Sequence, residues 1–168
     1  MFTQIIVQTL MAFAMGIFSL ILVYKILNEY LNRRYQLSDA RNTAYGVFQT
    51  GVILSTSLIL KTIVDPAISG FRLFAQSGLS STEIFLVFLY SILFVVIGVI
   101  CTLVLIAAAT MLLFYMSRIN EWEEIKKDNV GVALISASVL IGLSLVMGDN
   151  VGMLCETILP YPKVLFIP

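Results

Sequence analysis

The sequence predicts an all-α membrane protein with four transmembrane helices, arranged as two tandem two-helix repeats in parallel orientation. Of its 168 residues, 60% are hydrophobic and only 12% are charged, which is too apolar for a typical soluble domain. A pattern of small and polar residues also returns after 87 residues, in register and without a gap. It pairs Asn42, Ala44, Gly46, Gly51, Ser55 and Ser57 with Asn129, Gly131, Ala133, Ser138, Gly142 and Ser144.

Four apolar runs are long enough to cross a hydrocarbon core of about 30 Å, and helices satisfy their own backbone hydrogen bonds there. No basic residue precedes the first run, which continues past Ala14, so we expect an uncleaved helix and not a signal peptide. Asp65 and Pro66 are expected to end the second span, and Ser80–Glu83 form a predicted capping box before the third. The predicted spans are Ile5–Leu27, Ala44–Leu60, Ile84–Met116 and Val130–Met147.

The remaining segments form the predicted loops. Residues 66–81 should lie along the outer membrane surface, with a re-entrant pore loop as the alternative. Residues 116–128 should extend the third helix, with Ile119, Trp122 and Ile125 on one side, Trp122 among the lipid headgroups, and Glu123 paired with Lys127. The first repeat with its outer loop then covers residues 1–83, and the second with its C-terminal tail covers residues 84–168.

The distribution of Lys and Arg predicts the orientation. The first and third loops with their flanks hold seven of these residues, whereas the second loop and the tail hold three. Basic residues are enriched on the cytoplasmic side of short loops. Both termini are therefore expected to face the periplasm of a bacterium.

Each of the second and fourth spans has two faces suited to close helix packing, because small side chains let backbones approach. At 100° per residue, Ala44, Gly51 and Ser55 share one side of their helix. We expect the second face to bind a further helix, so that the protein forms a homo-oligomer. Self-contact should use either the Ala44–Gly51–Ser55 face or the Asn42–Gln49–Ser57 face, and we favour the first. Replacing either Gly51 or Gly142 by Leu should disturb helix packing. Gly131, Ser138 and Gly142 match the first face, and Asn42, Gly46, Gln49 and Ser57 lie roughly opposite it, with Asn129, Ala133, Ser136 and Ser144 as their counterparts.

Three polar residues have two interpretations each. We interpret Asn42 and Asn129 as helix N-caps, with a paired polar site near the repeat axis as the alternative. Gln49 lies about two turns into its span and needs a polar partner there. An interhelical hydrogen bond is favoured over a pore-lining or ligand-binding amide, and Ser136 occupies the equivalent position.

The composition argues against several functions. The chain has no His, the usual proton shuttle and commonest transition-metal ligand. Ten acidic and ten basic residues offer no broad basic surface for nucleic acid. We find no phosphate loop, metal-ligand cluster or catalytic triad, and predict no catalytic residue, metal, cofactor or enzymatic activity. The candidate residues for helix packing or pore lining are Asn42, Ala44, Gly46, Gln49, Gly51, Ser55, Asn129, Gly131, Ala133, Ser136, Ser138 and Gly142.

The two motifs resemble those of the YjfL-like family of bacterial inner-membrane proteins, or domain of unknown function 350. That family shows Asn-x-Ala-x-(Ala/Gly)-x-x-x-x-Gly opening the second helix of a four-helix unit, and a similar motif opening the fourth. Here these stand as Asn42, Ala44, Gly46 and Gly51, and as Asn129, Gly131, Ala133 and Ser138, with Ser138 replacing an expected Gly. The resemblance implies an inner-membrane location. Because members of the family tend to be encoded near envelope-stress proteins, it also implies a role in membrane homeostasis.

The sequence thus predicts a non-enzymatic assembly component of the bacterial inner membrane, linked to membrane homeostasis or envelope stress. The alternative is a homo-oligomeric channel or transporter for ions or small solutes. The expected partners are membrane lipids and further copies of the chain. A second interpretation of residues 116–128 adds a cytoplasmic or membrane-associated protein that docks there, and no nucleic acid is expected.

Overall fold

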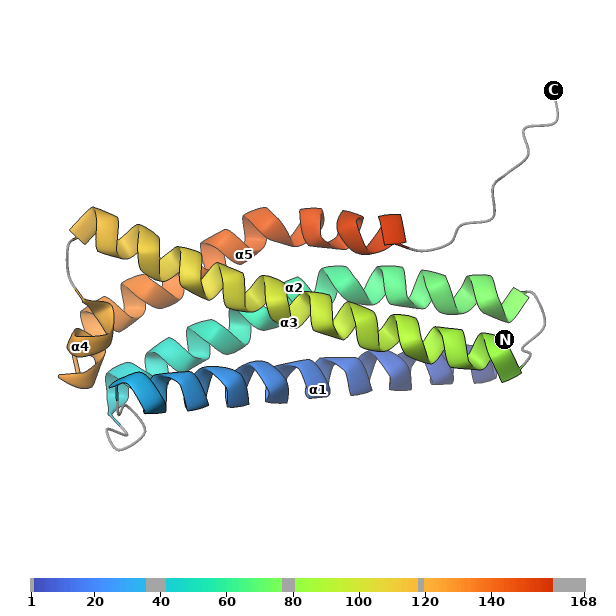
Figure 1. The fold of residues 1–168 in the computed structure, drawn as a ribbon, viewed down its shortest axis with the longest axis horizontal. Coiled ribbons are helices and arrows are strands. Elements are labelled where there is room, and N and C mark those ends of the chain that lie inside the picture. Colours follow the sequence, from blue (N-terminus) through green and yellow to red (C-terminus); the bar gives the residue numbers. More distant parts are fainter. Residues whose placement is uncertain (1, 36–41, 77–80, 118–119, 159–168) are drawn as a thin grey trace, which may run out of the picture.

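The computed structural model describes residues 2–35, 42–76, 81–117 and 120–158, and these ranges contain helices and no strand. The short helix α4 lies at one end of an elongated bundle, where α1 and α3 finish and α2 and α5 begin (Figure 1). We call this the α4 end. The elements are α1 (Phe2–Tyr35), α2 (Thr43–Gln76), α3 (Ser81–Ser117), α4 (Glu121–Lys126) and α5 (Val130–Ile158).

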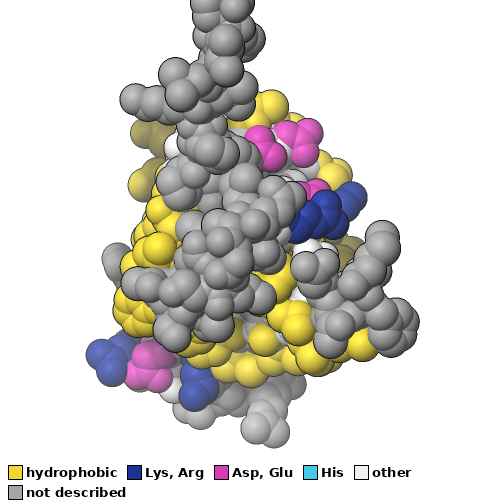
Figure 2. Space-filling view, turned by 90° about the vertical axis from the view of Figure 1, so that its right-hand side faces the viewer, with side chains coloured by type: hydrophobic (Ala, Val, Ile, Leu, Met, Phe, Trp, Pro, Cys, Tyr) yellow, Lys and Arg dark blue, Asp and Glu magenta, His cyan; other side chains and the backbone are white. Residues whose placement is uncertain are grey.

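The four long helices confirm the predicted number of transmembrane spans. Each is long and apolar enough to cross a membrane. Figure 2, which looks at the end opposite α4, shows hydrophobic side chains around the sides and charges in a few small groups. The spans cover Ile6–Arg33, Thr43–Arg72, Phe88–Tyr115 and Val130–Ile158, so three of them extend well past the sequence estimate.

The predicted end of the second span at Asp65 and Pro66 is wrong. α2 continues through Pro66 to Gln76, so residues 66–76 form neither a surface loop nor a re-entrant loop. Proline removes one backbone donor, but packing by neighbouring helices allows a membrane helix to continue through it, and Pro66 is buried. The predicted capping box begins at Ser80, which lies outside the described residues.

α2 is the central helix of the bundle and packs against α1, α3 and α5. Its side chains Phe48, Ile59 and Ile63 are fully buried. The most extensive contact joins α2 to α5, which runs in the same direction. α1 is the least buried of the four spans. The α2–α5 contact therefore forms the centre of the molecule.

Candidate functional site

The closest approach of α2 and α5 lies at Gly51. A Cβ atom built on Gly51 would lie 2.5 Å from the Cβ and 2.6 Å from the Cα of Ala137. The second of these atoms is backbone, so a larger residue at position 51 would push the two helices apart. Ala44, Ser55 and Ala133 are also buried, which extends this small-residue contact over several turns.

A second close approach lies about three turns further along α2. Because Pro66 has no N–H, the carbonyl of Thr62 lacks its usual helical donor. A Cβ built on Gly152 would lie 2.9 Å from this carbonyl oxygen, and one built on Gly148 would lie 3.3 Å from the Thr62 Cγ2. The two glycines thus allow α5 to pack directly on the backbone of α2 where proline has altered it.

At the α4 end, Asn42 joins α2 to α4. Its Oδ1 accepts a hydrogen bond from the Tyr45 N–H (2.8 Å), which is the predicted N-cap interaction. Its Nδ2 donates to the carbonyls of Ile125 (2.6 Å) and Lys126 (3.2 Å) at the end of α4. One amide therefore caps the start of α2 and the end of α4.

The counterpart Asn129 also caps its helix, since its Oδ1 accepts a hydrogen bond from the Val132 N–H (3.3 Å). Its Nδ2 donates to Glu124 Oε2 (3.0 Å), and Lys127 Nζ lies 2.9 Å from Glu124 Oε1. Hydrogen bonds from Lys127 and Asn129 lower the pKa of Glu124. Lys127 therefore pairs with Glu124 and not with Glu123 as predicted, because Glu123 Oε1 accepts a hydrogen bond from Asn120 Nδ2 (3.2 Å).

Asp128 links the two repeats at the same end. Its Oδ1 accepts a hydrogen bond from the Ala44 N–H (2.8 Å), which supplements the Asn42 cap of α2. Asp128 has a φ of 63°, a left-handed conformation that Asp and Asn tolerate better than most residues. This turn directs the chain from α4 into α5 while its side chain reaches α2.

Gln49 belongs to a chain of hydrogen bonds between α1 and α2. Its Nε2 donates to the Tyr45 hydroxyl (2.6 Å), which donates to Asn28 Oδ1 (2.7 Å). The Gln49 side chain is buried, and its Oε1 has no hydrogen-bond partner among the described residues. Gln49 therefore lies in a polar contact that reaches α1 through Tyr45, while the nearby Ser136 bonds to the carbonyl of Val132 in its own helix (2.9 Å).

The structure divides the predicted site residues into two groups. Ala44, Gln49, Gly51, Ser55, Ala133 and Ser136 are buried and Asn42 is partly buried, but Gly46, Asn129, Gly131, Ser138 and Gly142 are exposed. A Cβ on Gly142 would meet nothing within 4 Å, so the expectation that Gly51 and Gly142 have similar packing roles is wrong for the single chain. The face favoured for self-contact is occupied within the single chain, because Gly51 lies against Ala137 of α5 and both Ala44 and Ser55 are buried.

Residues 116–128 differ from the expected continuous extension. α3 ends at Ser117, and α4 is a separate short helix whose Trp122 and Ile125 are buried. The Trp122 ring meets Phe48 of α2 edge-on, with ring centroids 5.2 Å apart, and so does not face lipid headgroups as predicted. Ile119 lies outside the described residues. The apolar side chains Trp122 and Ile125 are thus turned into the protein.

Glu121 begins α4 and is a buried carboxyl, with 5% of its surface exposed. Its Oε1 has no hydrogen-bond partner among the described residues. Burial raises the pKa of Glu121, while a backbone hydrogen bond opposes the shift. Burial therefore disfavours the charged form of the Glu121 carboxyl.

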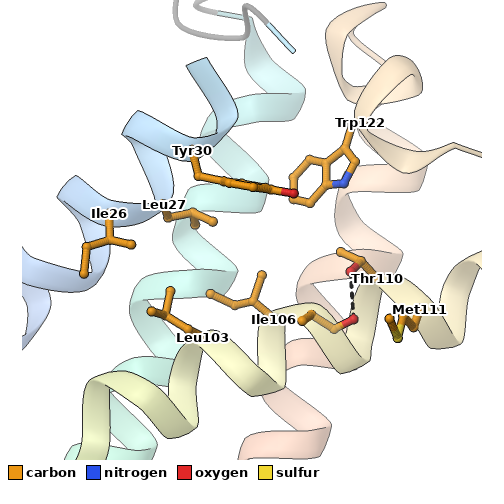
Figure 3. A pocket seen from close by; sticks show the side chains of 9 residues that line it. Ile26, Leu27, Tyr30, Leu103, Ile106, Thr110, Met111 and Trp122 are labelled. Atoms are coloured by element: carbon orange, nitrogen blue, oxygen red, sulfur yellow. Dashed lines mark hydrogen bonds between the residues drawn. The ribbon is translucent and has the colours of Figure 1, made fainter. Parts of the chain in front are cut away.

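A cavity of about 450 Å³ opens between α1 and α3 beside α4. Figure 3 shows Tyr30 of α1 extending towards Trp122 of α4, above Leu103 and Ile106 of α3. The Thr110 hydroxyl in its wall donates to the carbonyl of Ala107 (2.9 Å). Among the described residues, none with a charged side chain lines this cavity, whose walls offer contacts to apolar groups.

Sequence reasoning missed four residues of the α2–α5 contact: Thr62, Ala137, Gly148 and Gly152. All four have small side chains at helical spacing, which was the available signal. Gly148 and Gly152 lie beyond the predicted end of the fourth span, and Thr62 lies beyond that of the second. The short span estimates therefore hid the second half of the contact.

Comparison with known proteins gives a match at the level of a family. A family model described as Domain of Unknown Function (DUF350) matches residues 1–151. Neither the curated proteins nor the solved structures give a significant match.

Proposed function

The chain belongs to the DUF350 family, and from this premise we propose that it is a non-enzymatic, self-assembling component of the bacterial inner membrane. Its expected contacts are membrane lipids and further copies of itself. The family resemblance extends the proposal to membrane homeostasis or envelope stress. The Lys and Arg distribution adds that both termini face the periplasm.

The observation that carries this proposal is the use made of the polar side chains. Asn42 holds α4 against α2, and Gln49 bonds to Tyr45, which bonds to Asn28 of α1. These amides connect helices and are engaged within one chain. A protein whose Asn42 and Gln49 amide nitrogens donate hydrogen bonds in this way is suited to holding a fixed shape in the membrane.

The rival function is a channel or transporter, and it rests on the exposed hydroxyls of Thr50 and Ser57 on the outer side of α2. These hydroxyls donate to the carbonyls of Gly46 (2.9 Å) and Ile53 (2.8 Å) in their own helix. Such internal hydrogen bonds suit a face that meets lipid or protein. They favour the assembly role over a water-filled path.

Cysteine accessibility separates the two functions. Ser57→Cys would be placed in a background in which both native cysteines, Cys101 and Cys155, are replaced by Ala. Vesicles of both orientations would then receive a membrane-impermeant maleimide. The assembly role predicts no labelling of position 57 from either side, whereas a pore predicts rapid labelling. Lys126→Cys, which is exposed on α4, serves as the control that must react from one side.

A further inference from the structure

α2 and α5 bind each other through different faces, although the 87-residue pattern makes their positions equivalent. α2 uses its front face, defined here as Ala44, Gly51, Ser55 and Thr62, and α5 uses its back face, defined as Ala133, Ala137, Ser144 and Gly148. The front-face counterparts on α5 are Gly131, Ser138, Gly142 and Asp149, and all are exposed. The back-face counterparts on α2 are Gly46, Thr50, Ser57 and Lys61, and all are exposed as well.

Within the chain, the front face of α2 therefore packs on the back face of α5. The front face of α5 and the back face of α2 are left uncovered. We propose that the front face of α5 binds the back face of α2 in a second copy of this chain. The inference rests on the proposed self-assembly and specifies its surface. The occupant is a second copy because the same chain already shows how these two types of face fit together.

The contact inside the chain fixes the register of the contact between copies. Gly51 lies against Ala137, and their counterparts are Ser138 and Thr50. Thr62 lies against Gly148, and their counterparts are Asp149 and Lys61. Ser138 of one copy therefore meets Thr50 of the next, and Asp149 meets Lys61.

The second of these pairs brings opposite charges together. Lys61 and Asp149 are exposed and have no salt bridge within the described residues. At 1.5 Å per residue, each lies about 27–29 Å from the start of its helix, so the two are at matching depth. Charged groups near the hydrocarbon core are costly unless paired. Asp65, the counterpart of Gly152, lies one turn beyond Lys61 on α2.

The geometry of the faces favours a closed ring. The front and back faces lie roughly 100–160° apart around each helix, at 100° per residue. Because this angle is less than 180°, successive front-to-back contacts between parallel helices curve and return to the first copy. α3 packs on both α2 and α5, whereas its counterpart α1 packs on α2 and α3. In the ring, α1 would pack over the contact between two copies, as α3 packs over the α2–α5 contact within one copy.

Disulfide crosslinking in native membranes tests this interface in the cysteine-free background described above. Chains carrying both Thr50→Cys and Ser138→Cys should give a ladder of covalent multimers on oxidation. Co-expressed chains that carry one substitution each should give dimers only, and either single variant alone should give none. Lys61→Glu should reduce the crosslinking several-fold because it places like charges together, and adding Asp149→Lys should restore it.

Three results would overturn the proposal. Dimers from Ser138→Cys alone would mean that equivalent faces meet, as in a two-fold dimer. No crosslink from the double variant would mean that lipid or a different protein covers these faces. An unchanged crosslinking yield with Lys61→Glu would show that Lys61 and Asp149 do not pair across this interface. If native mass spectrometry shows an oligomer but Thr50→Cys and Ser138→Cys form no disulfide, this interface is refuted and self-assembly still stands.

Discussion

Gly51 and Gly142 show how the surroundings of a residue, and not its place in a motif, decide its role. Gly51 meets Ala137, whereas Gly142, on the equivalent face of α5, meets nothing within the chain. The sequence predicts correctly that Ala44, Gly51 and Ser55 share one side of a helix. It does not predict which helix covers that side, because burial depends on partners distant in sequence.

Replacing Gly51 by Ala should lower the free energy of unfolding by about 1–3 kcal/mol, the usual cost of overpacking. The added Cβ would meet the backbone of Ala137, which cannot turn away as a flexible side chain can. Gly16→Ala is the matched control, since nothing lies within 4 Å of its Cβ. It should be neutral or add up to about 1 kcal/mol through helix propensity. Thermal unfolding in detergent measures both, and equal effects would contradict the close contact.

Glu121 gives the chain a predictable response to pH. Its folded-state pKa is raised by burial, so its contribution to stability is present below the ordinary Glu value and is lost as the pH rises through the raised value. Glu121→Gln should therefore raise Tm at neutral pH and leave it unchanged at a pH well below 4. Glu123→Gln, an exposed position in the same short helix, should show no such pH-dependent gain. A lower Tm for Glu121→Gln at neutral pH would show that the carboxylate is stabilising.

Among the helices, the boundaries were harder to predict than their existence. Hydropathy identified all four spans, but Pro66 suggested an end that neighbouring helices prevent. The short helix α4 was missed because Trp122 and Ile125 have the same spacing in an interfacial extension as in a docked helix. What docks it is the Asn42 amide, 83 residues from Ile125 in sequence, and a contact of that range has no local signal.

Asn42→Ala should release α4 from the bundle more than Asn129→Ala does. Both lose an N-cap worth about 0.5–2 kcal/mol, but only Asn42 also donates to the carbonyls of Ile125 and Lys126. Trp122 is the only tryptophan, so its fluorescence reports on α4 directly. The emission should shift to the red and become easier to quench in Asn42→Ala. A larger shift in Asn129→Ala would contradict the role given to Asn42.

Considered as a whole, the molecule is an array of four apolar helices in which α2 is covered more fully than α5. This asymmetry follows from packing the front face of α2 on the back face of α5. A repeat found in sequence predicts matching faces on both helices. It cannot predict that matching faces have different partners, which depends on the position of each helix in the assembly.

The proposed orientation is tested with fusions to a reporter that is active only in the periplasm. Seven Lys or Arg residues in the first and third loops with their flanks, against three elsewhere, predict that both termini lie on the periplasmic side. A reporter fused after Pro168 should be active, and one inserted near Asp39 should be inactive. The opposite pattern would mean that both termini face the cytoplasm and would contradict the proposed orientation.

Native mass spectrometry of the intact protein in mild detergent tests self-assembly most directly. Unequal coverage of α2 and α5 predicts a single closed homo-oligomer, because every front face then has a back face. Lys61→Glu should shift this population towards the monomer, and Lys61→Glu with Asp149→Lys should restore it. A uniform monomer of the unaltered protein, or an open-ended series of sizes, would contradict the account.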